Sequence, residues 1–326
     1  MKQNILITGG AGYIGSHVVK LLGQTGNYNL TIVDNLSTGS KDAVLYGDLH
    51  IIDLAETDKL ESLFHSTKFQ AVIHFAASIE VPESVANPVK YYRNNTVNTL
   101  NLIDICNRHG VEKFIFSSTA AVYGDYKPQF AETDIPKPVN PYGRSKLMNE
   151  MILRDIAATS STMKYVILRY FNVAGADPQG KIGQNYPNAT HLIKVAAETA
   201  CGLRPQIQIY GTDYPTPDGT CIRDYIHVTD LASAHLEALN YLDQNPSETF
   251  NCGYGHGYSV KETLETMKEV SGKDFKTINA PRRAGDPPQV VSINKKILQK
   301  TNWKPTHNNL KTICQTALDW EKQKLQ

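Results

Sequence analysis

The chain lacks the features that mark several classes of protein. Its five cysteines are scattered, with no Cys-x-x-Cys pair, which argues against a disulfide framework or a thiolate metal site. The ten histidines show no spacing typical of a metal site, so we predict no metal. Charge is balanced, with 33 basic against 32 acidic residues, which excludes the broad basic surface of a nucleic-acid-binding protein.

Long apolar runs are also missing. No run approaches the ~20 residues of a membrane-spanning helix, so we expect no membrane partner. The first apolar run begins at Ile5, which leaves no room for a secretory leader, and together with the cysteine usage this predicts a cytoplasmic protein. The length of 326 residues predicts about two domains.

A glycine-rich stretch follows the first apolar run. Residues 5–7 read as a buried strand, Gly9, Gly12 and Gly15 follow at steps of three, and residues 16–22 read as a helix. Glycine permits the sharp turn from strand to helix and leaves the backbone open to a pyrophosphate, which the amino end of the helix attracts. Alone this pattern also fits an ordinary tight turn.

The context favours a dinucleotide site. A second strand over 30–33 ends at Asp34, which lies 19 residues after Gly15, close to the ~20 expected of a ribose-binding carboxylate. A carboxylate accepts hydrogen bonds from a ribose 2′-hydroxyl and repels a 2′-phosphate. The sequence therefore predicts NAD rather than NADP.

Strands and helices alternate through the first half of the chain. Further strands are predicted over 49–52, 71–77, 113–117 and 164–170. Helices are predicted over 57–65, from Asn87-Pro88 to Gly110 and from Asn140-Pro141 to about 158. This alternation predicts an α/β fold with a Rossmann-like, doubly wound parallel sheet, whose ligands bind at the carboxyl ends of the strands.

After Asn172 the pattern becomes mixed. Loops rich in Gly, Pro, Asp, Asn and Tyr are predicted over 177–188 and 211–220, with helices over 191–202, 230–242, 260–271 and 309–322. We expect an NAD-binding domain over 1–175, with return segments near 221–250. The remaining stretches, 176–220 and 251–326, form a smaller interleaved mixed α/β domain for the substrate.

Tyr142 and Lys146 stand four residues apart at the start of a helix, so both side chains lie on one face. Ionising a phenol at pH 7 needs roughly 4 kcal/mol of help. A cation at ~4 Å supplies about 1 kcal/mol in water and about 4 at an effective dielectric of 20, so Lys146 suffices only in a partly buried site. A positively charged nicotinamide ring adds to this effect, which favours alcohol oxidation with NAD. Thr119 is a candidate to bond the same substrate oxygen, or only its local backbone.

These motifs resemble the extended short-chain dehydrogenase/reductase family, and within it most closely the UDP-galactose (UDP-glucose) 4-epimerases. The resemblance spans nearly the whole chain. It is carried by segments 8–17, 34–36, 72–77, 117–124, 141–147, 168–172, 222–228 and 280–286.

The resemblance implies an isomerase that interconverts UDP-glucose and UDP-galactose with tightly held NAD. Tyr142 is implied to accept the proton of the sugar 4-hydroxyl, with Lys146 and Thr119 as catalytic partners. The 4-keto sugar then turns about its diphosphate and is reduced from the other face. A homodimer is also implied, through the helices that begin at Pro88 and Pro141.

The same resemblance assigns the binding residues. For the cofactor they are Gly9, Gly12, Tyr13, Ile14, Gly15, Asp34, Asn35, Ser37, Thr38, Gly39, Asp53, Leu54, Phe75, Ala76, Ala77, Asn95, Tyr142, Lys146 and Phe171. Asp48 competes with Asp53 for the adenine amine. We prefer Asp53 because an apolar strand precedes it and a helix follows.

For the UDP-sugar, Arg223 and Arg283 resemble a diphosphate clamp, although each also fits a surface ion pair. The complete set of implied substrate residues is Thr119, Tyr142, Asn172, His191, Leu192, Gln208, Tyr210, Arg223, Arg283, Asp286 and Val290.

The sequence departs from the family pattern at two positions. Ile79 stands where some of these epimerases carry a cofactor-binding Lys. Val290 stands where a bulky Tyr often narrows the sugar pocket. The second departure predicts that UDP-GlcNAc and UDP-GalNAc are admitted as well.

Three other functions of related proteins fit the sequence less well. A dehydratase needs an acid beside Thr119, but Ala120 and Ala121 follow it. For a decarboxylase we find no basic group to hold a hexuronate carboxylate. A catalytically inactive NAD-binding module would usually have lost Tyr142 or Lys146, and both are present.

Overall fold

The computed structural model of the protein describes residues 2–186, 189–283 and 285–325. Ala284, inside the motif segment 280–286, lies outside the described residues, as do residues 187–188 at the end of the loop predicted over 177–188. None of the helices in these ranges combines the length and the apolar character that crossing a bilayer requires.

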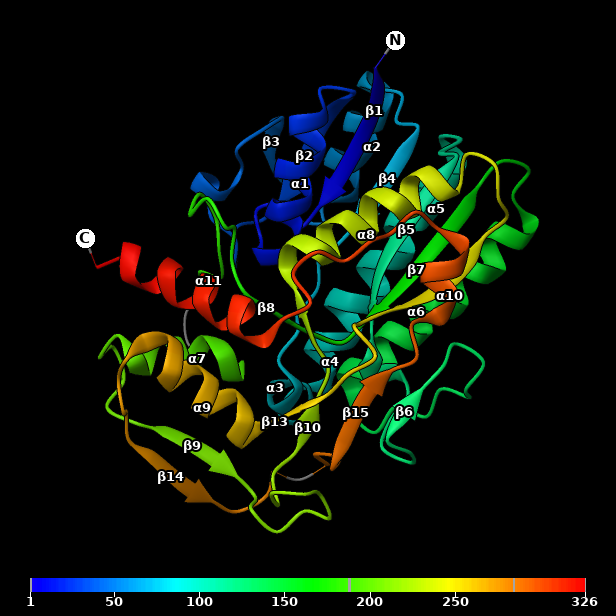
Figure 1. The fold of residues 1–326 in the computed structure, drawn as a ribbon. Coiled ribbons are helices and arrows are strands. Elements are labelled where there is room, and N and C mark those ends of the chain that lie inside the picture. Colours follow the sequence, from blue (N-terminus) through cyan, green and yellow to red (C-terminus); the bar gives the residue numbers. More distant parts are fainter. Residues whose placement is uncertain (1, 187–188, 284, 326) are drawn as a thin grey trace.

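Seven strands form one parallel sheet in the order β12-β7-β5-β4-β1-β2-β3 (Figure 1). The chain runs outward from the centre in both directions, and this arrangement confirms the predicted doubly wound fold. The elements of this part are β1 (Gln3–Thr8), α1 (Tyr13–Thr25), β2 (Tyr28–Asp34), η1 (Lys41–Ala43), β3 (Asp48–Ile51), α2 (Thr57–Ser66), β4 (Ala71–His74), α3 (Val81–Ala86), α4 (Pro88–Tyr91), η2 (Tyr92–Val97), α5 (Asn98–Arg108), β5 (Lys113–Thr119), η3 (Ala120–Val122), α6 (Pro141–Thr159), β7 (Lys164–Tyr170), α8 (Val228–Tyr241) and β12 (Glu248–Cys252).

Successive side chains along the central strands enter two different cores. On β1, Ile5 and Ile7 join the core that also contains residues of α1 and α8, such as Val19 and Leu231. Leu6, between them, joins the core with residues of α2, α5 and α6. Helices therefore cover both faces of the sheet, which explains why its central strands read as continuous apolar runs.

The long helix predicted from Pro88 is present but contains a π-helical turn, η2. Both predicted Asn caps are confirmed. The Asn87 side chain accepts a hydrogen bond from the Lys90 amide at 3.3 Å, and Asn140 accepts one from the Gly143 amide at 2.9 Å. The second cap fixes the start of α6, the helix that carries Tyr142 and Lys146.

Most of the remaining elements form a second lobe beside the carboxyl ends of the strands, whereas α10 (Lys295–Lys300) packs on β12 at the edge of the large sheet (Figure 1). A parallel pair, β9 with β14, and a four-stranded sheet, β13-β10-β15-β6, lie with three helices there. The remaining elements are β6 (Gln129–Phe130), β8 (Asn172–Ala174), α7 (Leu192–Ala200), β9 (Ile207–Tyr210), β10 (Ile222–Arg223), β11 (Tyr225–His227), β13 (Tyr258–Ser259), α9 (Val260–Ser271), β14 (Thr277–Ala280), β15 (Gln289–Ser292), α10 (Lys295–Lys300) and α11 (Leu310–Gln323). We propose to keep the interleaved division into 1–175 with 221–250, and 176–220 with 251–326, although β12 crosses its last boundary.

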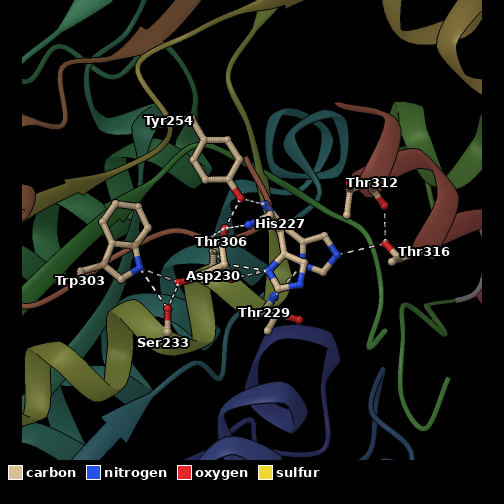
Figure 2. A network of polar contacts seen from close by, with 10 residues as sticks. His227, Thr229, Asp230, Ser233, Tyr254, Trp303, Thr306, Thr312 and Thr316 are labelled. Atoms are coloured by element: carbon tan, nitrogen blue, oxygen red, sulfur yellow. Dashed lines mark hydrogen bonds and ion pairs between the residues drawn. The ribbon is translucent and has the colours of Figure 1, made fainter. Parts of the chain in front are cut away.

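A buried carboxylate joins the two lobes (Figure 2). Asp230 on α8 accepts hydrogen bonds from the Tyr254 hydroxyl at 2.6 Å and from the amides of Thr306 and His307 at 3.1 and 2.8 Å. The Trp303 indole donates to the Asp230 carbonyl at 2.9 Å. Since α8 packs on α1, these bonds hold the segment before α11 against the nucleotide-binding part of the fold.

Candidate active site

One large cleft lies between the two lobes, at the carboxyl ends of the central strands. Its volume of about 1720 Å³ exceeds the roughly 300–1,000 Å³ of an ordinary small-molecule pocket, so it can hold a dinucleotide and a second ligand together. Residues from the ends of β1, β2, β3, β4 and β5 line one side, and residues of the second lobe line the other.

The glycine-rich stretch that connects β1 to α1 lines the cleft. Gly9 has φ +73°, and a Cβ there would lie 2.6 Å from the Ala76 amide nitrogen. A Cβ on Gly15 would lie 2.2 Å from the Gly9 carbonyl oxygen. Both positions therefore require glycine. The amino end of α1 has Gly12 as N-cap, with no capping side chain and no acidic residue in the first turn, and thus fits the pyrophosphate of NAD.

Two acidic residues follow the next strands. Asp34, at the end of β2, is buried and lines the cleft, and its carboxylate accepts from the amides of Ala11 and Leu36 at 3.0 and 2.8 Å. Asp53 follows β3, lines the cleft and accepts from the Asn35 side chain at 2.7 Å. Asp48 begins β3 at the opposite edge of the sheet, so only Asp53 of the two candidates faces the cleft.

Most predicted site residues line this cleft, but three do not. Gly39 packs on Ala11, where a Cβ would come within 2.9 Å. Asn95, expected to reach toward the cofactor, is fully buried in the π-helical turn. The Asn95 side chain accepts a hydrogen bond from the Ser78 amide and donates to the Ser78 carbonyl. It also donates to the Ser145 hydroxyl at 3.1 Å. Asn95 thus shapes the wall after β4 from behind, and Lys146 likewise lies behind the cleft surface.

Tyr142 is 8% exposed, lines the cleft and packs edge-on against Tyr91, with ring centroids 6.5 Å apart. Burial raises the pKa of Tyr142 to about 12, and a hydrogen bond with Thr119 acts in the opposite direction. The Thr119 hydroxyl also accepts from the Ala121 amide at 3.1 Å, which is the predicted contact with its local backbone. The phenol is therefore a buried, neutral group unless a nearby positive charge stabilises its anion.

Lys146, one turn further on α6, donates to the Ser117 carbonyl at 2.9 Å. Burial lowers the pKa of Lys146 to about 7, against the raising effect of the Glu150 carboxylate. The sequence predicts a cation beside the phenol that suffices only in a partly buried site. The structure shows instead a buried amine whose charge depends on its surroundings, because desolvation outweighs the single nearby carboxylate.

A buried ionic group behind Lys146 was not identified from the sequence. Glu150 accepts from the Arg169 Nε at 2.9 Å and from the Ser118 hydroxyl at 2.5 Å. Arg169 also donates to the Tyr123 hydroxyl at 3.0 Å. The signal was available, because Tyr142, Lys146 and Glu150 repeat every four residues on α6 and share one face.

The second lobe contributes longer and more exposed groups. Arg223 on β10 donates from Nη2 to Asp286 at 2.5 Å, so two predicted substrate residues pair with each other. The Arg283 guanidinium lies 3.9 Å from the ring centre of Tyr210, whose hydroxyl donates to Gln208. Together they form a charged and aromatic end of the cleft, suited to a diphosphate and a planar base.

Residues between these two ends face the centre of the cleft. Phe171 and Val290 belong to a small apolar cluster with Val122 and Phe130, and Asn172 begins β8 beside it. His191, the residue before α7, contacts Gln184 through its Nδ1 at 3.0 Å, and Leu192 follows it in the cleft wall.

Several cleft residues were missed at the sequence level. Glu80 follows the predicted strand 71–77, and its Oε2 accepts from the Thr190 hydroxyl at 3.0 Å, joining the two lobes. Tyr170 and Arg204 also line the cleft. Glu80 and Arg204 lie outside the motif segments, so only the three-dimensional arrangement identifies them, whereas Tyr170 lies within segment 168–172.

The fold and the site define a dinucleotide-dependent enzyme with a Tyr–Lys pair and a charged, aromatic second end of the cleft. The chain belongs to the NAD dependent epimerase/dehydratase family, whose family profile matches residues 5–253. This finding confirms the family resemblance seen in the sequence.

Three relatives illustrate the similarity. A UDP-glucose 4-epimerase of Azospirillum brasilense is 51% identical over 98% of this chain and 92% of its own length. The structure of the UDP-Glc/GlcNAc 4-epimerase from Campylobacter jejuni is 55% identical, with a TM-score of 0.87 over 98% of this chain and 99% of the other. The crystal structure of UDP-glucose 4-epimerase from Brucella ovis in complex with NAD is 42% identical, with a TM-score of 0.93 over 97% and 98%.

Proposed function

We propose that the protein interconverts UDP-glucose and UDP-galactose by transient oxidation at C4, with NAD retained between turnovers. The observation that carries this proposal is the buried Tyr142 in one cleft with both an uncapped dinucleotide-binding helix and an arginine-rich second end. Full-length relatives named UDP-glucose 4-epimerase support the choice of substrate.

NAD supplies the hydride acceptor and donor when it is bound in the cleft. Gly9, Gly12 and Gly15 would hold its pyrophosphate at the start of α1, Asp34 would accept from its ribose, and Asp53 would bond its adenine amine. Phe75, Ala76 and Ala77 would also contact the cofactor, and Phe171 would pack near the nicotinamide. These assignments rest on the cleft lining together with the family resemblance.

The chain's own groups handle the proton. Tyr142 accepts the proton of the 4-hydroxyl and later returns it, while Thr119 orients the same oxygen. Lys146 in its charged form stabilises the phenolate. The Glu150 carboxylate, which raises the pKa of Lys146, favours that form. Arg223 and Arg283 hold the diphosphate, leaving the sugar free to turn in front of Val290.

The deciding experiment uses the purified protein, UDP-galactose and no added NAD. We expect UDP-glucose to form, and we expect Tyr142→Phe to lower the rate by about 10²–10⁴-fold while the protein keeps its NAD. Tyr126→Phe is the matched control, because Tyr126 is exposed and lies outside the residues that line the cleft. No conversion by the wild-type protein, even with added NAD, would favour a binding module or another sugar.

A second substrate pair has one supporting observation. Val290 leaves the sugar region of the cleft wider than a bulky aromatic side chain would, and a 55% identical relative is named a UDP-Glc/GlcNAc 4-epimerase. Turnover of UDP-GlcNAc comparable to that of UDP-glucose would extend the function to N-acetylhexosamines. Absence of detectable UDP-GlcNAc turnover would exclude this extension.

We further propose a homodimer formed through α5 and α6. These helices pack together, and their outer side chains include the exposed apolar residues Leu100, Met148 and Met151. Met151→Glu is expected to yield a monomer by light scattering. We also propose the cytoplasm as the compartment, since all five cysteines are unpaired.

A further inference from the structure

A cluster of potential metal ligands lies outside the cleft, where α2 and α5 end beside each other. Glu61 and His65 stand four residues apart on α2, so their side chains leave the same face of the helix. His109 is the C-cap residue of α5. Both helices end just before a strand begins, which puts the cluster at the amino edge of the sheet, opposite the cleft.

The three side chains already face one another. One ligand atom from each lies within 4.8 Å of the other two, and the His109 Nε2 is 2.8 Å from the Glu61 Oε2. The rings of His65 and His109 meet edge-on, with centroids 4.9 Å apart. Phe64 packs against His109 at 5.4 Å and limits its movement, whereas His65 is exposed and can turn toward an ion.

We propose that Glu61, His65 and His109 form a binding site for one divalent cation of the zinc type. Two imidazole nitrogens and one carboxylate oxygen suit Zn²⁺ or Ni²⁺, whereas Mg²⁺ and Ca²⁺ prefer oxygen ligands. Bonds of about 2.0–2.2 Å put tetrahedral ligand atoms roughly 3.3–3.6 Å apart, so an ion would replace the direct contact between Glu61 and His109 and draw the exposed His65 inward. Water completes the coordination, and the ion joins the ends of α2 and α5 instead of taking part in catalysis.

One neighbouring group opposes the ion. Arg108 pairs with the Oε1 of Glu61 and donates to Asp104 at 3.0 Å. Its positive charge repels a cation, but it leaves the Oε2 of Glu61 directed at His109. Removing this charge is therefore expected to strengthen metal binding.

The sequence-based expectation of no metal came from spacing alone. His109 follows His65 by 44 residues, and only the packing of α5 on α2 brings the two together. Glu61 and His65 form a Glu-x-x-x-His pair, which a helical-face search would have found.

The test is isothermal titration of the untagged, chelator-treated full chain with ZnCl₂. We expect one tightly bound equivalent, weakened at least tenfold in His65→Ala and strengthened in Arg108→Gln. His65 is exposed, so its replacement leaves the fold intact, and the equally exposed His256→Ala serves as the matched control. Zinc is also expected to raise the melting temperature of the wild-type protein and of His256→Ala, but not of His65→Ala.

Two outcomes would overturn the proposal. Either the wild-type protein binds no zinc, or His65→Ala binds it with the same stoichiometry and affinity as the wild-type protein. Neither measurement depends on turnover, so the result is independent of the proposed epimerase activity.

Discussion

The two sides of the cleft are built differently. On the cofactor-facing side, the key groups are buried and already hold fixed partners, as Asp34 and Lys146 do. On the side facing the UDP-sugar, Arg283 and Gln208 are exposed, and Arg223 and Asp286 pair with each other. The first side is arranged before any ligand arrives, whereas the second consists of long side chains that can exchange partners.

This difference matches what the proposed reaction requires. A cofactor that stays bound through many turnovers gains from rigid partners, because little conformational freedom is lost on binding. A sugar that presents first one face and then the other must be held by its diphosphate and only loosely at the ring. Substitutions at particular positions of the cleft test this difference, beginning with the largest expected effect.

The largest effect is expected on the cofactor-facing side, for Lys146→Met. Removing the amine that lies one turn from Tyr142 on α6 should lower epimerase turnover by about 10²–10⁴-fold and reduce the NAD content of the purified protein. Turnover and cofactor absorbance measure the two effects. Lys113→Met is the control, because Lys113 is also buried but pairs with Asp243 away from the cleft. Equal losses in both variants would mean that folding, not the site, had failed.

On the opposite side, Arg283→Gln should raise the KM for UDP-galactose by about 10–100-fold and leave kcat nearly unchanged. A charged hydrogen bond to the diphosphate contributes roughly 1.5–3 kcal/mol to binding in both ground and transition states. Arg282→Gln offers a close comparison, since Arg282 stacks on Tyr214 and pairs with Asp213 outside the cleft. The same KM in both variants would remove Arg283 from the diphosphate clamp.

Lowering the pH should reduce the folding stability of the cofactor-facing side, because histidines there are buried and stay neutral in the folded chain. Burial lowers the pKa of His235 to about 4, and its Nε2 contacts the Ser117 hydroxyl at 2.9 Å. Above a pH of about 6.5 the ring is neutral in both folded and unfolded chains. As the pH falls from there toward 4, the unfolded chain binds the proton first and stability is lost, by about 2 kcal/mol at pH 5.

Urea unfolding at pH 7 and pH 5 measures this loss. The variant His235→Gln should lose about 2 kcal/mol less than the wild-type protein over the interval. An exposed histidine, changed in His256→Gln, should give the wild-type dependence. If His235→Gln also follows the wild-type curve, the ring is not held neutral by burial.

The smallest effect is expected from Val290→Tyr, at the centre of the cleft. A tyrosine ring there should lower UDP-GlcNAc turnover by about tenfold or more through steric exclusion, with UDP-glucose turnover changed by only a small factor. Parallel assays with both substrates measure the ratio. The conservative change Val290→Ile provides the control, and an equal loss for both sugars would show that the residue does not select between them.

The first half of the fold was predictable from the sequence because its strands are covered on both faces. Apolar runs such as 5–7 and 164–170 therefore coincide with β1 and β7. β12 was missed because Glu-Thr-Phe-Asn-Cys has no such run, and its partner β7 is distant in sequence. The small strands of the second lobe were equally hidden, since two-residue pairings such as β10 with β13 leave no periodicity.

The site was predictable where backbone geometry or a helical repeat dictates the residue type, as at Gly9, Gly15, Tyr142 and Lys146. It was less predictable where direction matters. Asn95 was placed on the correct helix, but its side chain faces Ser78 because the backbone groups there need buried partners. The sequence predicts a charged Lys146 in a partly buried site. Its full burial, which lowers its pKa to about 7, becomes visible only in the structure.

The strand order also bears on how the chain is synthesised. β7 lies between β5 and β12, and β12 leaves the ribosome only after residues 171–247 have been made. Until then the outer edge of β7 carries unpaired backbone groups that another chain can bind. During translation the nascent protein thus passes through a stage in which the outer edge of β7 is unpaired. We expect chaperone binding to matter most during that stage.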